Sequence, residues 1–391
     1  MRILQVTSTG YVCGGAEKSV VVLRDGLRAR GHQVRIMSSD CEPDIPHYSD
    51  YECVRIGGPF RFLKHLWSVS AYRTLKLAIR QFRPHVVHFH TLGELSPSVL
   101  FALGGTPALL TVHGPEEYTR TVLEWYMRRR VFKGGQVSRD NLTIRGRMHV
   151  TFHGNLQRPL YKAGFRRLRL MVSPSRYFAV KLADERYGVP VRQVYNGIVL
   201  PAAQPLPEAQ NLLYVGRLEH VKGAEVLLRA MPSIVAAVPG VRLRIVGDGP
   251  DRHLLETLTR ELSLTAAVTF CGWRDEDAVL AEYADARVHV VPSIWPDNLP
   301  TVVMEALAVG RPVVGSRVGG IPELIEDGIS GAIVESGNAG AFASAIIALL
   351  TDSTLAAKAE AARVSAHRFC LDTFITNIEN VYGEVLARVD A

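Results

Sequence analysis

The feature that most constrains the fold is a repeated alternation of short apolar runs with longer segments of helical periodicity. Runs rich in Val, Ile and Leu predict buried strands, and apolar residues recur at helical spacing between them. Successive βαβ units have this pattern, because parallel strands need crossover helices. We therefore predict an α/β protein with two parallel sheets, each covered by helices on both faces. The predicted strands are Ile3–Thr7, Gln33–Ser38, Val86–Phe89, Ala108–Val112, Arg169–Val172 and Val191–Tyr195 in the first half, and Leu212–Val215, Arg242–Val246, Val268–Cys271, Val288–Val291, Val313–Ser316 and Ala332–Val334 in the second.

The domain boundary follows from one segment of different composition. Residues 201–210, PAAQPLPEAQ, are rich in Pro and Ala and show no periodicity, as a linker between domains does. A chain of 391 residues is also long enough for two domains. We predict a first domain over 1–200, a second over 211–372, and a last helix within 373–391.

Composition argues against several classes of protein. An apolar content of 47% supports globular cores. No apolar run reaches the roughly 20 residues of a membrane span, and the amino terminus lacks the features of a secretory signal peptide. The five cysteines are scattered and form no C-x-x-C motif, which favours a reducing compartment and a cytoplasmic protein. Without a G-x-G-x-x-G fingerprint, a dinucleotide-dependent oxidoreductase is not expected.

Positive charge is concentrated in one segment. Residues 118–169 hold thirteen Arg or Lys and only two acidic residues, Glu124 and Asp140, so this segment carries +11. Since the whole chain carries +7, the remaining residues carry −4. Such a charge run is either a solvated basic face or the binding surface for an anionic partner. Within it, Val122–Lys133 mixes aromatic residues with three arginines, which suits an anionic bilayer or a lipid-phosphate acceptor, and a soluble phosphorylated or acidic saccharide is the alternative. The segment has no recognition-helix or RRM-type pattern, so nucleic acid is not expected.

Two loops that follow predicted strands carry groups suited to phosphate. Gly14 and Gly15 lie between the first predicted strand and its helix, where glycine permits close backbone approach to a ligand, although a tight turn without a ligand has the same residues. Arg217 and Lys222 follow the first predicted strand of the second half. Arg can contact two phosphate oxygens and Lys supplies a compact charge, but such residues are also common on solvated loops.

The segment Pro292–Gly310 combines two carboxylates with a helix start. Pro300 suits the first turn of a helix, whose free amides and positive dipole end favour an anion such as a diphosphate. Asp297 lies outside this helix, free to accept hydrogen bonds from sugar hydroxyls. Glu305 lies about two turns further on, placed for a second polyol such as a ribose. A capped core helix with an acidic flank is the alternative interpretation.

Other candidates also follow predicted strands. Gly249, Gly272 and Arg274 lie at the carboxyl edge of the second sheet, where open α/β sheets bind ligands. Asp275 and Asp277 beside them fit helix capping better than a metal site.

Histidines follow two strands of the first half. His113 has a side chain that can act as acid, base or hydrogen-bond donor near neutral pH, although a lone histidine after a strand is more often structural. We assign no chemistry to His88 and His90. No nearby Cys or carboxylate completes a zinc site with these histidines.

Taken in order, these motifs resemble those of the GT4 family of retaining GT-B glycosyltransferases. The resemblance runs from about residue 5 to residue 335. The family usually has Glu where this chain has Asp297. The matching segments are GGAE at 14–17, TVHG at 111–114, GRLEHVKG at 216–223, GDGP at 247–250, FCGWR at 270–274, the acidic pair at 297 and 305, and VGGIPE at 318–323.

The resemblance implies two Rossmann-like domains facing each other across a cleft, with the last helix crossing back to the first domain. It implies transfer of a hexosyl group from a nucleotide sugar to a saccharide, lipid-linked or small-molecule hydroxyl, with retention and an α-linkage. A metal or further cofactor is not expected. The implied catalytic residues are Arg217, Lys222, Asp297 and His113, and the implied donor-binding residues are Gly14, Gly15, Gly216, Gly249, Gly272, Arg274, Asn298, Leu299, Pro300, Thr301 and Glu305.

Two further expectations concern membrane contact and the alternative function. A cytoplasmic protein of this family could contact the inner face of the membrane peripherally through 118–169. The alternative function within the same fold is a sugar-nucleotide epimerase or hydrolase, which would release nucleotide without needing an acceptor.

Overall fold

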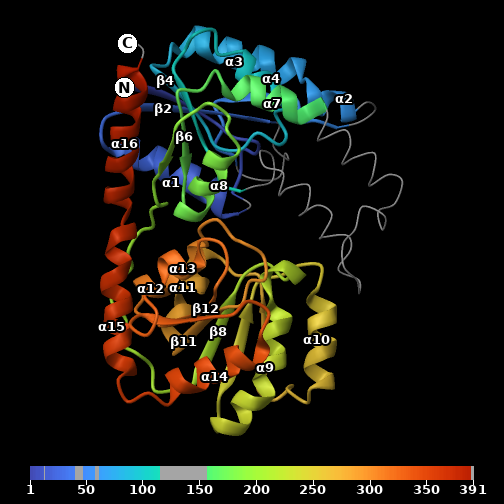
Figure 1. Ribbon diagram of the computed structural model, residues 1–391, viewed down its shortest axis with the longest axis vertical. Helices are drawn as coiled ribbons and strands as arrows, with labels where there is room; N and C mark the ends of the chain where they lie inside the picture. Colours follow the sequence, from blue (N-terminus) through green and yellow to red (C-terminus); the bar gives the residue numbers. More distant parts are fainter. Residues whose placement is uncertain (13, 40–46, 58–60, 115–155, 389–391) are drawn as a thin grey trace. The chain divides into compact units, whose positions relative to one another are not determined.

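The structure is a computed structural model, and it describes residues 1–391 except Cys13, 40–46, 58–60, 115–155 and 389–391. The chain forms two compact units (Figure 1). The first comprises 1–197 and 371–391, and the second comprises 198–370. Most of the basic segment 118–169, including Val122–Lys133, therefore lies outside the described residues.

The first unit is built on a seven-stranded parallel sheet in the order β3-β2-β1-β4-β5-β6-β7. Chain order reverses between β1 and β4, which is a topological switch point. The strands are β1 (Arg2–Val6), β2 (Gln33–Ser39), β3 (Tyr51–Cys53), β4 (Val86–Phe89), β5 (Ala108–Thr111), β6 (Leu170–Ser173) and β7 (Val191–Gln193). The helices are α1 (Gly15–Ala29), α2 (Arg61–Leu66), α3 (Val69–Phe82), α4 (Ser98–Phe101), α7 (Arg158–Phe165), α8 (Arg176–Asp184) and the C-terminal α16 (Leu371–Ala387).

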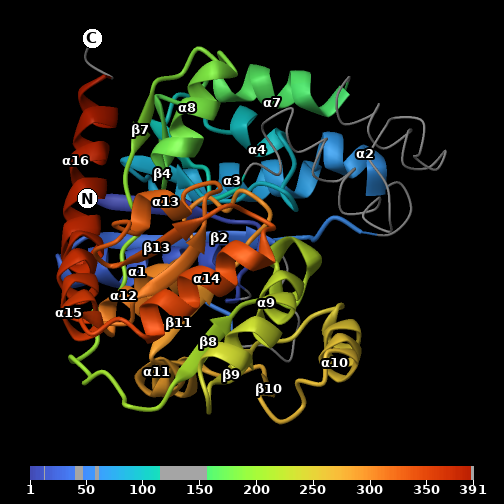
Figure 2. The ribbon, with the colours of Figure 1, turned by 60° about the horizontal axis from the view of Figure 1, so that its bottom comes forward.

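Helix α16 packs on the first unit although it follows the second unit in sequence (Figures 1 and 2). Its buried side chains repeat at helical spacing and join the core formed by α1 and the first sheet. Close packing is visible at Gly26 of α1, where an added Cβ would lie 1.9 Å from Cδ1 of Ile375. Glycine at this position therefore lets the two helices approach each other.

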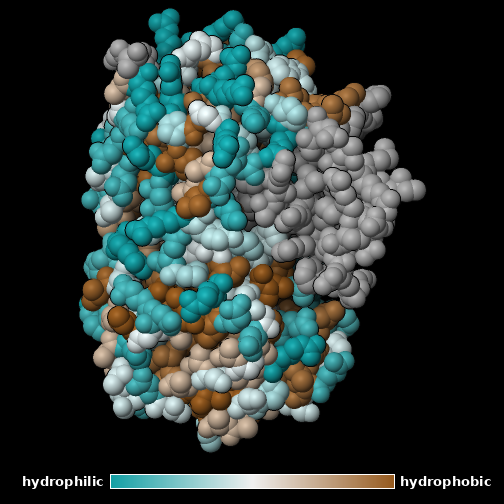
Figure 3. Space-filling view, in the orientation of Figure 1, coloured by the Kyte–Doolittle hydropathy of each residue, from teal (hydrophilic) through white to brown (hydrophobic). Residues whose placement is uncertain are grey.

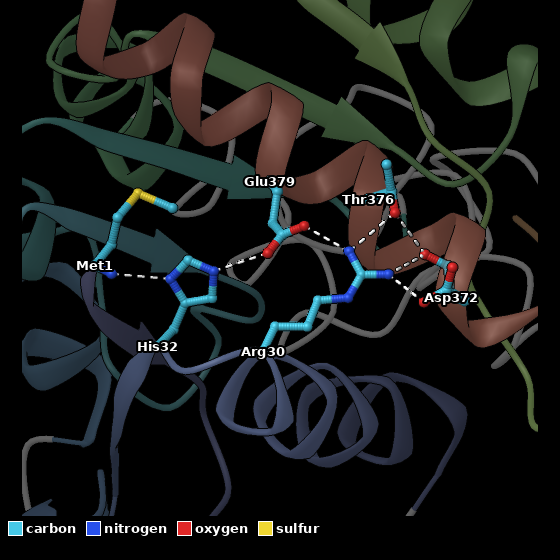
Figure 4. A network of polar contacts seen from close by, with 6 residues as sticks. All are labelled: Met1, Arg30, His32, Asp372, Thr376 and Glu379. Atoms are coloured by element: carbon cyan, nitrogen blue, oxygen red, sulfur yellow. Dashed lines mark hydrogen bonds and ion pairs between the residues drawn. The ribbon is translucent and has the colours of Figure 1, made fainter.

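A polar network anchors the start of α16 to the end of α1 (Figure 4). The guanidinium of Arg30 bonds to the carboxylates of Asp372 and Glu379, and it also bonds to the hydroxyl of Thr376 at 2.9 Å. His32 bridges Glu379, at 2.8 Å, and the amino group of Met1, at 2.9 Å. The contacts with two carboxylates raise the pKa of Arg30.

The second unit is built on a six-stranded parallel sheet in the order β10-β9-β8-β11-β12-β13, with its switch point between β8 and β11. Helices α9 and α14 lie together on one face of this sheet (Figure 2). The strands are β8 (Asn211–Val215), β9 (Arg242–Val246), β10 (Val268–Gly272), β11 (Val288–Val291), β12 (Val313–Ser316) and β13 (Gly331–Val334). The helices are the 3-10 turn η3 (His220–Lys222), α9 (Ala224–Ala237), α10 (Arg252–Glu261), α11 (Glu276–Asp285), α12 (Thr301–Ala308), α13 (Ile321–Leu324), α14 (Ala339–Leu350), α15 (Leu355–Ala366) and the 3-10 turn η4 (His367–Phe369).

The segment 201–210 belongs to the second unit, which begins at Ile198. Arg311 is fully buried and donates a hydrogen bond to the carbonyl of Pro205 at 2.9 Å. Burial lowers the pKa of Arg311 to about 10. This arginine holds the Pro-rich segment against the second unit, a contact that composition does not reveal.

Among the described residues, no single helix is long and apolar enough to cross a bilayer. Helix α14 and the segment Leu355–Phe369 reach that length and apolar content only together, and the pair is bent by 106°. Hydrophilic residues cover most of the visible face of the first unit in Figure 3. Apolar residues appear there singly or in small groups.

Candidate active site

The predicted second-domain residues gather at the carboxyl edge of the second sheet. We call four of the loops at this edge the loop cluster: 216–223 after β8, 247–250 after β9, 292–300 after β11 and 317–320 after β12. The first and third of these loops flank the switch point between β8 and β11. Ligands of open α/β sheets bind at such points, because adjacent loops diverge there.

Backbone hydrogen bonds join the loops of the cluster to one another, and the loop after β9 to the end of β10. These bonds cross from each loop to the next, so a shift in one loop disturbs its neighbour. The bonds run from Leu218 N to Asp248 O (2.9 Å), from Ile294 N to Val221 O (3.0 Å), from Gly320 N to Asp297 O (2.8 Å) and from Gly247 N to Gly272 O (2.8 Å).

Two glycines permit this close approach. Gly223 has a φ of 73°, and an added Cβ would lie 1.9 Å from the carbonyl oxygen of Pro292. Gly247 has a φ of 127°, and its Cβ would lie 2.0 Å from the carbonyl oxygen of Gly216. Both positions therefore need glycine for conformation and for space.

Lys222 and Asp297 form an ion pair across the switch point. The Lys222 ammonium lies 2.5 Å from one Asp297 oxygen, and the other oxygen accepts a hydrogen bond from the Ser293 hydroxyl at 2.7 Å. Asp297 was predicted to lie outside the helix, free for sugar hydroxyls. It does lie before α12, and each of its carboxylate oxygens has one partner within the loop cluster. Its contact with sugar hydroxyls stays a prediction, since each carboxylate oxygen can accept more than one hydrogen bond.

Arg217 is exposed at the tip of the loop after β8. Its side chain is 66% exposed and pairs with Glu219 at 2.9 Å. An ion pair this exposed contributes little stability, so the guanidinium can exchange it for an anionic ligand at small cost. The backbone of Arg217 is held more firmly than its side chain, since the buried hydroxyl of Tyr214 donates a hydrogen bond to the Arg217 carbonyl at 3.2 Å.

Helix α12 directs its N-terminus toward the loop cluster. Pro300 is the N-cap residue and Thr301 is the first helical residue, so Pro300 lies one position before the first turn predicted for it. No side chain of the N-cap residue binds the first amides, and their dipole favours an anion there. Asn298 and Leu299, just before Pro300, are both buried, each with 7% of its surface exposed.

Glu305 has a partner that sequence analysis missed. The Tyr283 hydroxyl lies 3.2 Å from a Glu305 oxygen and 3.1 Å from the Val302 carbonyl. Tyr283 is buried in α11, and burial, followed by the nearby Glu305 charge, raises its pKa well above the ordinary value. The contact between Tyr283 and Glu305 could not be predicted from their spacing in the sequence, because the two residues belong to different helices.

The loop after β10 presents exposed groups next to the loop after β9. Arg274 is exposed, the Trp273 side chain is 74% exposed, and Gly272 has a φ of 71°. Gly249 packs so that an added Cβ would lie 2.4 Å from the Leu218 carbonyl oxygen.

Asp275 is confirmed as a cap. Its side chain accepts a hydrogen bond from the Ala278 amide at 2.9 Å, at the N-terminus of α11. Across all described residues, no group of three or more His, Cys, Asp and Glu side chains could hold a metal ion.

In the first unit, Gly14 and Gly15 begin α1 at the carboxyl edge of β1. Gly14 is the N-cap residue with extended backbone, makes no side-chain cap, and is exposed together with Gly15. The helix therefore presents its first amides and the positive end of its dipole at this edge.

His113 closes a column of three histidines in the first unit. Its Nε2 lies 3.2 Å from Nδ1 of His90, and the two rings are stacked. The His90 ring also lies 4.0 Å from that of His88, which bonds to Tyr382 of α16 at 2.8 Å. Desolvation lowers the pKa of His113 to about 4, so its imidazole is neutral at pH 7.

Comparison with known families accounts for both units. The model of the family described as "Glycosyltransferase Family 4" matches residues 13–200, and that described as "Glycosyl transferases group 1" matches 209–352. This chain belongs to glycosyltransferase family 4. The GT4 enzyme thus carries both of the family's domains, and the fold class predicted from sequence, GT-B, is confirmed.

Relatives of this GT4 enzyme are glycosyltransferases. The phosphatidyl-myo-inositol mannosyltransferase of Mycobacterium leprae is 26% identical over 98% of this chain and 97% of its own length. The D-inositol 3-phosphate glycosyltransferase of Corynebacterium aurimucosum is 34% identical over 44% of this chain and 43% of its own length. This GT4 chain is accordingly a glycosyltransferase enzyme.

Solved structures share its fold. The sucrose-phosphate synthase of Thermosynechococcus elongatus has a TM-score of 0.77 at 22% identity and covers 99% of this chain and 100% of its own. Anabaena HepE, determined in complex with UDP, has a TM-score of 0.72 at 19% identity and covers 97% of this chain and 99% of its own.

Proposed function

We propose that this glycosyltransferase transfers a hexosyl group from a nucleoside-diphosphate sugar to a hydroxyl acceptor, with retention and an α-linkage. The observation that carries the proposal is the loop cluster, which gathers Arg217, Lys222 and the N-terminus of α12 at the β8/β11 switch point. All three are positive, and a diphosphate is the negative group of the donor. The UDP bound in the structural relative Anabaena HepE supports this choice of donor.

The main catalytic role that we assign to the protein is stabilisation of the leaving group. Departure of the nucleoside diphosphate places negative charge on its terminal phosphate oxygens. Lys222 and the first α12 amides are held in place before the reaction, so they can stabilise this charge with little reorganisation. Arg217 adds its charge after its guanidinium leaves Glu219. The anomeric carbon gains oxocarbenium character, and the departing phosphate oxygen accepts the acceptor proton on the same face, which gives retention.

The remaining donor contacts are assigned by position. Glu305 accepts hydrogen bonds from the ribose hydroxyls, since its carboxylate lies one turn into α12 and is held by Tyr283. Gly249, Gly272 and Arg274 surround the base. In the first unit, the roles of Gly14, Gly15 and His113 toward the donor stay predictions from the family resemblance.

Donor binding is tested with UDP-, GDP-, dTDP- and ADP-sugars in a thermal-shift screen, because specific binding raises the unfolding temperature with ligand concentration. With the donor that binds, Lys222→Ala should lower kcat at least about a hundredfold, since a charge-assisted contact to the leaving group is lost. The matched control is Lys358→Ala, which removes the other lysine of the second unit. Wild-type turnover by Lys222→Ala, or an inverted product anomer by NMR, would contradict the proposal.

The acceptor is proposed to be anionic. Support comes from the +11 charge of residues 118–169 and from two relatives named for phosphorylated inositols.

The same segment is proposed to contact an anionic membrane peripherally from the cytoplasmic side. In liposome sedimentation at physiological salt, we expect the protein to pellet with vesicles containing anionic lipid and to stay in solution with neutral vesicles. Equal partitioning in both would remove the membrane proposal.

A further inference from the structure

The carboxylate of Asp297 faces the loop cluster. Its side chain is 14% exposed, and its two oxygens contact the Lys222 ammonium at 2.5 Å and the Ser293 hydroxyl at 2.7 Å. Ser293 is itself 2% exposed. The Lys222 side chain is 34% exposed, so of the two side chains in the ion pair it is the more accessible to solvent.

The backbone of both partners is fixed independently of the ion pair. The Asp297 carbonyl accepts a hydrogen bond from the Gly320 amide at 2.8 Å. Gly319, with a φ of 59°, packs so closely that an added Cβ would lie 2.3 Å from the same carbonyl oxygen. Lys222 ends η3, directly before the tightly packed Gly223. The loops therefore bring the two side chains together before any ligand binds.

The length of the aspartate side chain fits this arrangement. Asp is one methylene shorter than Glu, so its carboxylate stays close to its own backbone, where Ser293 and Lys222 meet it. We propose that Asp297 is a positioning residue, which acts through Lys222 by holding the ammonium in place for the donor diphosphate. This inference rests on the proposed function, because it takes Lys222 to contact the diphosphate.

An opposing effect on binding and turnover follows. A lysine ammonium has three N–H donors, so Lys222 can keep its bond to Asp297 and still offer two donors to phosphate. The Asp297 charge competes with the diphosphate for the same cation and weakens binding of the nucleotide product. The same charge keeps the ammonium in one position, which favours turnover because reacting groups are pre-oriented.

The experiment is calorimetric titration of wild type and Asp297→Asn with UDP, GDP, dTDP and ADP, together with steady-state kinetics. We expect Asp297→Asn to bind the nucleoside diphosphate about three- to tenfold more tightly, because a competing charge is gone, and to lower kcat about tenfold. In a Lys222→Met background, the same substitution should change the dissociation constant less than about twofold, as expected for coupled residues. Asp297→Glu restores the charge and should return the dissociation constant to within about twofold of wild type.

A sugar-binding role predicts a different result. If Asp297→Asn leaves the dissociation constant of the nucleoside diphosphate unchanged and raises only the KM of the nucleotide sugar, the inference is wrong. Ser293→Ala provides a second variant of unchanged charge, for which we expect kcat to fall about threefold with an unchanged KM. Failure of the wild type to bind any of UDP, GDP, dTDP and ADP would instead overturn the proposed function, and this inference with it.

Discussion

At the scale of single residues, glycines determine how closely the loops of the second unit approach. Gly223 combines a left-handed φ of 73° with a carbonyl oxygen 1.9 Å from the position of an added Cβ. Gly240 has a similar φ of 79° and nothing within 4 Å of its added Cβ. Substituting each of these two glycines therefore distinguishes the cost of a left-handed backbone, which both positions have, from the cost of steric overlap, which only Gly223 has.

We expect Gly240→Ala to cost about 1 kcal/mol of unfolding free energy, from the left-handed backbone alone. Gly223→Ala should cost at least about 3 kcal/mol, because the loop after β8 must also move away from Pro292. Urea denaturation of the two variants measures both losses. Equal losses would show that the contact between the two loops adds no constraint.

At the scale of elements, helices bring residues from distant parts of the chain to the two sheets. Helix α12 carries Glu305 and presents its N-terminus beside Asp297, while α11 supplies Tyr283 from outside any predicted motif. Helix α16 returns to the first unit and places Tyr382 against His88 across 294 positions of sequence. Secondary structure is predictable from local periodicity, but neither of these pairings is.

Two missed elements show where periodicity fails. Helix α15 buries one leucine and three alanines, so the apolar contrast between its faces is weak, although alanine favours helix. Strand β3 has only three residues and lies at the edge of the first sheet, too short to show alternation. Both elements are stabilised by tertiary packing or strand pairing, and a sequence segment this short does not indicate such contacts.

At the scale of the whole molecule, each unit buries neutral histidine. Burial, and then His113, lowers the pKa of His88 to about 3. In the second unit, burial lowers the pKa of His289 to about 3. Histidine in an unfolded chain has a pKa of about 6.5, so between these values the unfolded state binds more protons than the folded state.

Stability is therefore expected to fall as the pH decreases from about 6.5 toward 4, by a few kcal/mol in total. Chemical denaturation at pH 7.5 and pH 5.0 measures this difference. His289→Leu removes one titrating group from the second unit and should make the dependence shallower. A free energy of unfolding that is the same at both pH values would contradict the assignment of these histidines as buried and neutral.

The sequence by itself determined which segments form strands and which residues follow them. Periodicity is local, and it was enough to place Arg217, Lys222, Asp297 and Glu305 beyond the strands of the second sheet. Their spacing left solvated loops and a capped core helix as alternatives, and the prediction of phosphate binding depended on the resemblance to the GT4 family. Strand order, which places β8 beside β11, was decided only by tertiary structure. So were the partners of the site residues, since Lys222 meets Asp297 across 75 positions and Tyr283 meets Glu305 across 22. Such partners depend on the packing of whole helices and loops, for which no short stretch of sequence holds the information.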